Sequence, residues 1–418
     1  MEPVLDLAAF VSASPTPYHA VAESVRRLGA AGFTEQVETQ DWDDSPGGRY
    51  LVRDGTVLAW FTGEHGVRRA PLRIFAAHTD SPTLKVKPRP DTGAAGWRQV
   101  GVEVYGGALW NSWLDRDLGL AGRLALYDGT VVPVNVARPL LRVPQLAIHL
   151  DREVNQGLKL DPQRHLLPIW GLGAAREGDL LEFLASETGV DASQIAAHDL
   201  VVHDLTPPAR IGRDEELFAA PRLDNQLSLH AGVTALIAAA RENVPTTPVL
   251  VGFDHEEIGS ESATGAAGPL LERLLTHLAG GVGSRDQVFA AARALSCDVS
   301  HAAHPNYLER HDPSHLSVPN GGPLLKVNAN QRYATDAPGA AAWRRACRDA
   351  AVPSQVFVSR NNIPCGSTVG PILSTRLGIR TVDVGVPILS MHSARELCGA
   401  DDPGHLATAA TAYLTDPV

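Results

Sequence analysis

The second half of the chain alternates between short apolar runs and longer segments with helical periodicity. Strands that alternate with helices in this way form a mainly parallel sheet that helices cover on both faces. The alternation begins after Pro207-Pro208. The sequence therefore predicts an α/β fold with a mainly parallel sheet. The predicted helices are 223–241, 268–278, 338–349, 367–376 and 402–414.

A segment of different texture precedes this alternation. From residue 88 to residue 212 the signals are short strands, Gly and Pro turns, and one helix near 177–187. Such signals are typical of a β-rich domain. We therefore expect one α/β domain, made of residues 1–87 and 213–418, which is interrupted by an inserted β-rich domain at 88–212.

Three short segments carry local structural signals. Thr16 followed by Pro17 is typical of a helix start, because threonine caps the first turn and proline suits its first position. Asp54-Gly55 and Asp128-Gly129 each lie between two apolar runs. Such pairs favour a tight β-hairpin, since glycine adopts a positive φ without strain.

Composition narrows the class of protein. The 418 residues are 44% hydrophobic and 20% charged, as in ordinary globular enzymes. The net charge of -11 argues against nucleic acid or an anionic membrane as a partner. No apolar stretch approaches the roughly 20 residues of a membrane span, and the first residues do not resemble a signal peptide. The four cysteines form no CxxC pair, so we expect reduced thiols and a cytoplasmic location.

Two adjacent glutamates, Glu256 and Glu257, follow the apolar run 249–253. That run predicts a buried strand, and Gly259 interrupts the pattern soon after it. Ligands of open α/β sheets bind beyond the carboxyl ends of strands. One carboxylate there could hold a metal while the other acts on a water molecule, as in a hydrolase. Taken alone, adjacent glutamates are also common on solvated helix faces.

Three other apolar runs end in residues that bind metals in proteins. The first ends at His78, the second at Asp298, and the third, 379–392, at His392. Asp80, two residues beyond His78, could fix the tautomer of its ring. Each residue also has a plainer explanation, as part of a polar turn or as a lone polar side chain.

Asp224 opens the helix predicted from residue 223. Aspartate is a favoured helix N-cap, so this position alone proves little. Together, however, the candidates complete two sites that share Asp224. The first site would comprise His78, Asp224 and Asp298, and the second Asp224, Glu257 and His392. Nitrogen and oxygen ligands without thiolate suit two catalytic zinc ions per subunit, with Mn²⁺ or Co²⁺ as substitutes.

Seven motifs follow one another along the chain: His78–Asp80, Arg222–Asn225, Asp254–Ser262, Asp298–Asn306, Lys326–Tyr333, Asn362–Gly370 and Met391–Arg395. From the helix start at Ser14 to the last helix, this ordered set resembles the M18 aspartyl aminopeptidases. The resemblance implies a phosphorylase-like α/β catalytic domain with two zinc ions and an inserted dimerisation domain. It also implies a homo-oligomer of twelve subunits, a tetrahedron built from dimers, that removes N-terminal aspartate or glutamate from peptides.

The resemblance also implies roles for single residues. Glu256 matches the general base, and Asp80 matches the residue that orients His78. The residues that match positions facing the acidic substrate side chain are His301, Lys326 and Tyr333. His255 departs from the family, since many relatives carry asparagine there. We expect this change to be neutral.

His149 matches a histidine that the inserted domain sends into the active site of a neighbouring subunit. The alternating pattern of Leu146–Asp151 around it predicts a strand with an outward polar edge.

Two other functions remain open. The chain could be an aminopeptidase of the same family with neutral or broad preference. It could also be a non-enzymatic assembly or cargo protein on the same fold. Proteins of the latter kind usually lose metal ligands, whereas this chain carries all five ligands and the base.

Overall fold

The structure is a computed structural model that describes residues 2–64, 70–242 and 244–418. The chain divides into two compact units. The first comprises Met1–Asp80, Pro208–Met391 and Glu396–Val418, and the second Ser81–Pro207 and His392–Arg395. The sequence analysis placed the insertion at 88–212.

The boundaries found in the structure lie several residues earlier, because pairing decides them. Strand β5 (Thr83–Ala94) already pairs with strands of the second unit, and β11 (Ala209–Ile211) already pairs with β12 (Leu217–Ala220) of the first.

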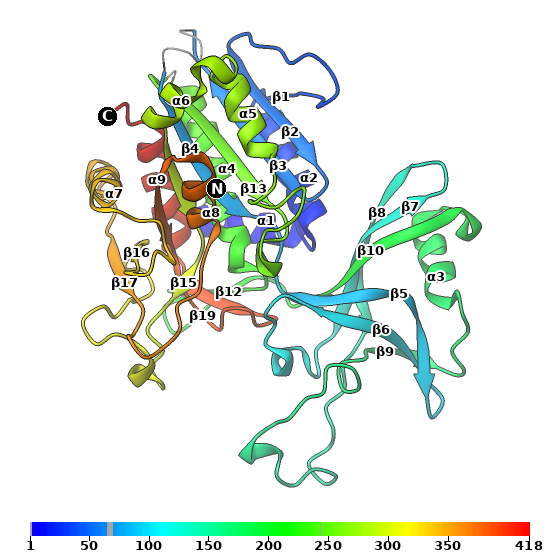
Figure 1. Cartoon of the computed structure of the whole chain (residues 1–418). Helices are drawn as coiled ribbons and strands as arrows, with labels where there is room; N and C mark the ends of the chain where they lie inside the picture. The colour runs from blue at the N-terminus through cyan, green and yellow to red at the C-terminus, as the bar shows by residue number, and fades with distance from the viewer. Residues whose placement is uncertain (1, 65–69, 243) are drawn as a thin grey trace. The chain divides into compact units, whose positions relative to one another are not determined.

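The first unit is built on a sheet with the strand order β1-β2-β3-β13-β4-β14-β18-β16-β17 (Figure 1). Its four central strands, β13, β4, β14 and β18, run parallel, whereas β3 runs antiparallel to β13. The predicted α/β class is therefore confirmed. The strands are β1 (Thr34–Glu35), β2 (Gly47–Arg53), β3 (Thr56–Thr62), β4 (Leu72–His78), β13 (Thr247–Phe253), β14 (Arg293–Cys297), β16 (Leu324–Val327), β17 (Gln355–Val358) and β18 (Arg380–Gly385).

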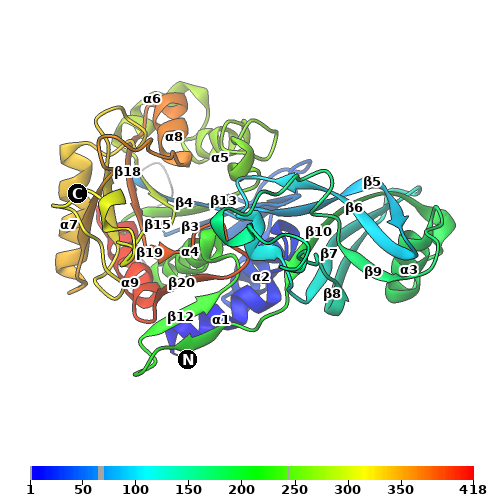
Figure 2. The ribbon, with the colours of Figure 1, turned by 90° about the horizontal axis from the view of Figure 1, so that it is seen from below.

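Helices cover both faces of this sheet. Figure 2 shows α5, α6 and α8 on one side of the strands and α1, α2, α4 and α9 on the other. Side chains alternate along β4: Ile74 packs in the core beneath α5, and Phe75 packs in the core beneath α4. The helices are α1 (Pro3–Ala13), α2 (Pro17–Ala30), α4 (Leu223–Arg241), α5 (Leu270–Leu278), α6 (Val282–Ala291), α7 (Ala337–Asp349), α8 (Val369–Leu377) and α9 (Asp402–Thr415).

The local signals of the first unit hold in the structure. Thr16 accepts the backbone N–H of His19 at the start of α2. Strands β2 and β3 form a hairpin in which Asp54 adopts a left-handed conformation with φ 51°. These short signals succeed because each depends only on residues that are adjacent in the chain.

A second sheet of the first unit has the order β11-β12-β20-β19-β15, and it corrects one expectation. The run 379–392 is not a single strand. Strand β18 ends at Gly385, and β19 (Pro387–Leu389) belongs to this second sheet, so His392 does not end a strand of the central sheet. The chain leaves the central sheet where the pairing of β18 with β14 ends. The other strands are β15 (Ser300–His301) and β20 (Glu396–Gly399).

The second unit is an antiparallel sheet with the order β8-β7-β10-β5-β6-β9 and one α-helix within its described residues, α3 (Asp179–Thr188). Its own apolar core includes Leu120, Val202 and Leu184. The Asp128-Gly129 hairpin joins β7 and β8, as predicted. The remaining strands are β6 (Trp97–Tyr105), β7 (Leu118–Leu126), β8 (Val131–Leu141), β9 (Ile169–Leu172) and β10 (Ile195–Asp204).

The strand predicted around His149 is absent from the described structure. Residues 147–150 instead form a turn, in which the N–H of Leu150 donates to the carbonyl of Ala147 at 2.8 Å. The prediction was wrong because an alternating pattern makes a strand only where a neighbouring strand accepts its hydrogen bonds.

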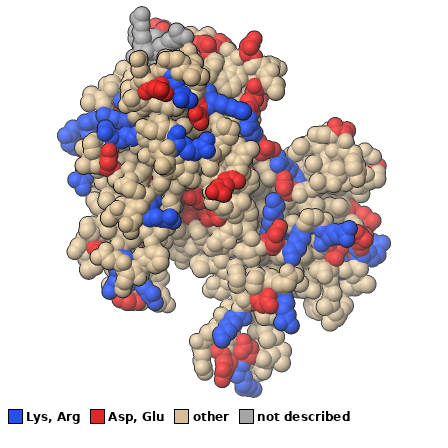
Figure 3. Space-filling view, in the orientation of Figure 1, with Lys and Arg blue, Asp and Glu red and all other residues tan. Residues whose placement is uncertain are grey.

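Acidic and basic side chains are interspersed over the face of the molecule that Figure 3 shows. Among the described helices, none combines the length and the apolar character that crossing a membrane requires.

Candidate active site

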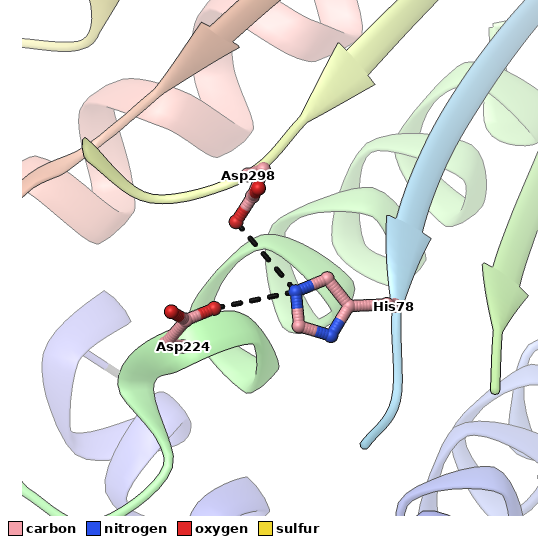
Figure 4. Close-up of side chains that lie close together, drawn as sticks. All are labelled: His78, Asp224 and Asp298. Atoms are coloured by element: carbon pink, nitrogen blue, oxygen red, sulfur yellow. Dashed lines mark ion pairs between the residues drawn. The ribbon is translucent and has the colours of Figure 1, made fainter. Parts of the chain in front are cut away.

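Two parallel strands and one helix bring three predicted ligands together. His78 is the last residue of β4, and Asp298 directly follows its neighbour β14. Asp224 lies in the first turn of α4. The Nε2 atom of His78 lies 3.2 Å from Oδ1 of Asp224 and 3.6 Å from Oδ1 of Asp298 (Figure 4). Neighbouring parallel strands end at the same sheet edge, which explains this convergence.

Asp224 does not act as the N-cap of α4. Arg222 occupies the cap position with φ 55°, and Asp224 itself has a non-helical backbone. Its backbone N–H donates to Oε2 of Glu396 at 2.9 Å, and its carboxylate points toward His78 (Figure 4). The Asp224 side chain is therefore directed at His78 from a kink that precedes the regular part of α4.

Asp80 joins the histidine to the two glutamates. Its Oδ1 lies 3.3 Å from Nδ1 of His78, whose ring also contacts the Asp80 carbonyl at 3.0 Å. The same carboxylate accepts the backbone N–H groups of Glu256 and Glu257, each at 3.1 Å. One buried side chain thus fixes both the ring of His78 and the start of the segment that carries the glutamates.

The two glutamates lie in a short 3₁₀ helix, Glu256–Ile258, which follows β13 as predicted. His255 before it has φ 63°, and Gly259 after it has φ 101°. Oxygen atoms of both glutamates lie within 4.8 Å of a ring nitrogen of His78. Both carboxylates therefore face the candidate metal site around His78.

The electrostatics of this cluster favour a cation. Burial alone lowers the pKa of His78, but three carboxylates outweigh it and hold that pKa well above its ordinary value. They belong to Asp224, Asp298 and Asp80. Burial raises the pKa of Glu256 to about 7; His78 opposes this shift, whereas Asp298 adds to it. A buried group of carboxylates that raise one another's pKa is a site that a cation stabilises.

The distances fit zinc as well. Two ligands of a tetrahedral zinc ion, each about 2 Å from the metal, are roughly 3.3 Å apart. The spacings of 3.2 Å and 3.6 Å around His78 Nε2 agree with that value. All donors are nitrogen or oxygen, which suits a catalytic rather than a structural zinc site.

His392 belongs to the second unit, so its place in the metal site stays a prediction. Its Nδ1 lies 3.1 Å from the carbonyl oxygen of Gly107 within that unit. A histidine that donates from Nδ1 keeps Nε2 available as a metal ligand.

The residues predicted to face the substrate side chain gather around Phe357 in the first unit. The ring centres of His301 and Tyr333 lie 5.9 and 6.3 Å, respectively, from the ring centre of Phe357. The ammonium group of Lys326 lies 5.3 Å from the centre of the Tyr333 ring and donates to the carbonyl of Val299 at 2.7 Å. Burial raises the pKa of Tyr333, so its hydroxyl stays protonated.

His149 is exposed in the second unit, within a turn rich in apolar side chains. Leu146, Ile148 and Leu150 are 57%, 50% and 75% exposed. The turn itself carries none of the other predicted site residues.

Two residues that hold the turn around Asp224 were not predicted from the sequence, namely Glu396 and Asn225. Glu396 holds the backbone of Asp224, and Asn225 donates from Nδ2 to the carbonyl of Cys297 at 2.8 Å. Asn225 thereby ties the turn that carries Asp224 to the residue before Asp298. A carboxylate at the first position of the short strand β20 was the available signal for Glu396.

Comparisons with known proteins show the family to which this chain belongs. The sequence pattern of the family described as aminopeptidase I zinc metalloprotease (M18) matches residues 10–414. A probable M18 family aminopeptidase 2 of Streptomyces coelicolor is 58% identical over 417 residues, which is 98% of this chain and 96% of the relative.

Solved structures show the same fold. Ape4, in a complex with Nbr1, matches with a TM-score of 0.95 and 37% identity over 99% of this chain and 85% of that one. The mApe1 dodecamer of S. cerevisiae matches with a TM-score of 0.86 and 28% identity over 98% of this chain and 95% of that one. The family pattern and the close relatives together cover nearly the whole chain, which therefore belongs to the M18 family of zinc aminopeptidases.

Proposed function

We propose that this aminopeptidase removes N-terminal aspartate or glutamate from peptides. The observation that carries the proposal is the buried cation Lys326, which is 2% exposed. In the described part of the chain, no carboxylate lies within ion-pair distance of its ammonium group, which contacts Val299 and Tyr333 instead. Buried lysines are rare unless they are paired. The buried carboxylate of Asp383 acts electrostatically on this cation from beyond ion-pair distance. An acidic substrate side chain would supply a direct partner.

The position of this cation supports the proposal. Lys326 donates to Val299, the residue directly after the candidate ligand Asp298. The ammonium group of Lys326 therefore contacts the chain one residue after a candidate metal ligand. A substrate held by its first side chain there would present its first peptide bond to the cluster.

We further propose two zinc ions per subunit. His78, Asp224 and Asp298 would hold one, and Asp224, Glu257 and His392 the other. When bound, such ions polarise the scissile carbonyl and lower the pKa of the attacking water.

The chain's own groups would move the proton. Glu256 would take a proton from the attacking water and pass it to the leaving amine. Asp80 supports this role, because its carboxylate accepts the backbone N–H of Glu256 and faces the ring of His78. Asp80 would thereby keep the proposed base Glu256 and the candidate ligand His78 in fixed positions relative to each other.

We also propose association into dimers, and a dodecamer built from them. The mApe1 relative is a dodecamer. The exposed apolar side chains around His149 suit burial against a second copy, because clustered exposed apolar residues mark protein contacts. His149 would then enter the neighbour's site. The cytoplasmic location stays a prediction.

A scan of N-terminal residues on chromogenic amides tests the proposal. Aspartyl and glutamyl amides should give the highest kcat/KM. A preference for leucyl or alanyl amides would instead support the neutral alternative. Absence of turnover on every amide, with zinc bound, would support a non-enzymatic role.

A further inference from the structure

A cleft of about 350 Å³ lies in the first unit beside His301. Its lining residues come from the segments 301–304, 310–311, 357–360, 363–366 and 388–391, and its titratable lining side chains are of basic type. They are His301, His304, Arg310, His311 and Arg360. No aspartate or glutamate is among the described residues that line it. Two arginines line this cleft in a chain with a net charge of -11, while Glu309 and Asp312 line an adjoining hollow together with Arg360.

The arginines of the cleft lack strong partners. Within residues 2–64, 70–242 and 244–418, the guanidinium group of Arg360 has neither an ion pair nor a hydrogen bond. Arg310 lies 3.9 Å from the adjacent Glu309, and both side chains are largely exposed, at 70% and 66%. An exposed pair at that distance contributes little, so both charges remain available for a ligand.

The histidines add hydrogen-bond donors. Nδ1 of His304 accepts the backbone N–H of Asn306 at 3.2 Å, and Nε2 of His311 accepts that of His304 at 3.0 Å. A neutral imidazole that accepts at one nitrogen carries its hydrogen on the other. Nε2 of His304 and Nδ1 of His311 are therefore donors. Guanidinium and N–H donors together suit a carboxylate, which only accepts.

One extended segment connects the candidate metal ligand Asp298 to the start of the cleft at His301. From Asp298 to Ala302 the chain runs beside β18 and β19, with Ser300 donating to Val386 and Ala302 to Ile388. Three extended residues, from Asp298 to His301, span about 10 Å. A bound peptide covers a similar distance in two or three residues beyond its first peptide bond.

We infer that this cleft binds a carboxylate of the substrate downstream of the scissile bond, at its second or third residue. The enzyme would then prefer peptides that carry a further acidic residue. This inference rests on the proposed function, since it extends the same substrate site. Arg360 would be the main determinant, because its charge lacks a partner in the described chain.

The test compares three peptide amides, Asp-Ala-Ala, Asp-Asp-Ala and Asp-Ala-Asp, with the complete zinc-loaded enzyme. We expect one of the two doubly acidic peptides to have a kcat/KM about tenfold above that of Asp-Ala-Ala, mainly through KM. Arg360→Met should bring this ratio close to one, and Arg310→Met should lower it less. The ratio should also fall as salt concentration rises.

Arg348→Met is the matched control, since that arginine is 74% exposed on α7 and pairs with Asp349. It should keep the ratio of the unaltered enzyme. The inference is overturned if the unaltered enzyme cleaves Asp-Ala-Ala without preferring a second acid, and the proposed function then still stands. It is also overturned if Arg360→Met lowers turnover of Asp-Ala-Ala relative to Ala-Ala-Ala, because the cleft would then recognise the first side chain.

Two further outcomes separate the alternatives. Inhibition by inorganic phosphate without any peptide preference would show a small-anion site and overturn the inference. Failure to cleave any N-terminal aspartyl peptide would overturn the proposed function, and this inference with it.

Discussion

The cluster around His78 and the turn around His149 are held in opposite ways. His78 is 2% exposed, and its ring contacts three carboxylates from separate parts of the first unit. The turn around His149 exposes its apolar side chains. The carboxylates around His78 are thus assembled within one chain. A buried environment for His149, in contrast, requires a partner surface.

The largest effect should come from removing the proposed base, Glu256. Glu256→Gln should lower kcat by roughly 10²–10⁴-fold while zinc content stays the same, because the amide cannot accept a proton. Zinc content by atomic spectroscopy and kcat on an aspartyl amide measure both effects. Glu257→Gln is the matched control and should lose zinc from one site. Equal zinc loss in the two variants would contradict this division of roles.

The next largest effect concerns the buried cation. Lys326→Met should weaken transition-state binding of aspartyl substrates by about 2–5 kcal/mol relative to alanyl ones, since one partner of a desolvated pair is removed. The ratio of kcat/KM for the two amides measures this. Lys87→Met, which loses a hydrogen bond to Gln163 in the second unit, is the control. A uniform loss on both substrates would assign Lys326 a structural role.

A smaller effect should follow from loosening the turn that carries Asp224. Asn225→Ala removes the hydrogen bond to the Cys297 carbonyl and should weaken zinc binding by about 10–100-fold. Competition with a zinc chelator measures the affinity. Asn135→Ala, at an exposed position of β8, should leave it unchanged. Unchanged affinity in Asn225→Ala would mean that Glu396 alone holds the turn.

The smallest effect concerns His149 and its proposed role in a neighbouring subunit. His149→Ala subunits mixed with Glu256→Gln subunits should regain roughly a quarter of full activity, because half of the dimers are hybrids with one complete site each. Each variant alone should be nearly inactive. Light scattering follows the exchange of subunits. If exchange occurs and no activity returns, His149 acts within its own subunit or not at all.

The sequence predicted those parts of the site that follow from strand ends. His78 ends β4, Asp298 follows β14, and the two glutamates follow β13. These strands run parallel, so the ends of three apolar runs sufficed to place four side chains near one another. The capped start of α2 and both hairpins were predictable for the same reason, since their signals are local.

The remaining features depend on distant partners. Glu396 supports Asp224 across 172 positions of the chain, and Asn225 reaches Cys297 across 72. No spacing rule predicts such bonds. Helix α6 has only one fully buried side chain, Phe289, so its sequence carries little helical periodicity. The strand predicted around His149 does not form. Its residues alternate as in a strand, but no neighbouring strand pairs with them in the described structure.

Two zinc ions per subunit are proposed to bind at these strand ends. Zinc anomalous scattering from crystals of the enzyme tests this proposal most directly. We predict two peaks per subunit, roughly 3.5–4 Å apart, one contacting His78, Asp224 and Asp298 and the other Asp224, Glu257 and His392. A single peak, or peaks that do not touch Asp224, would contradict the claim.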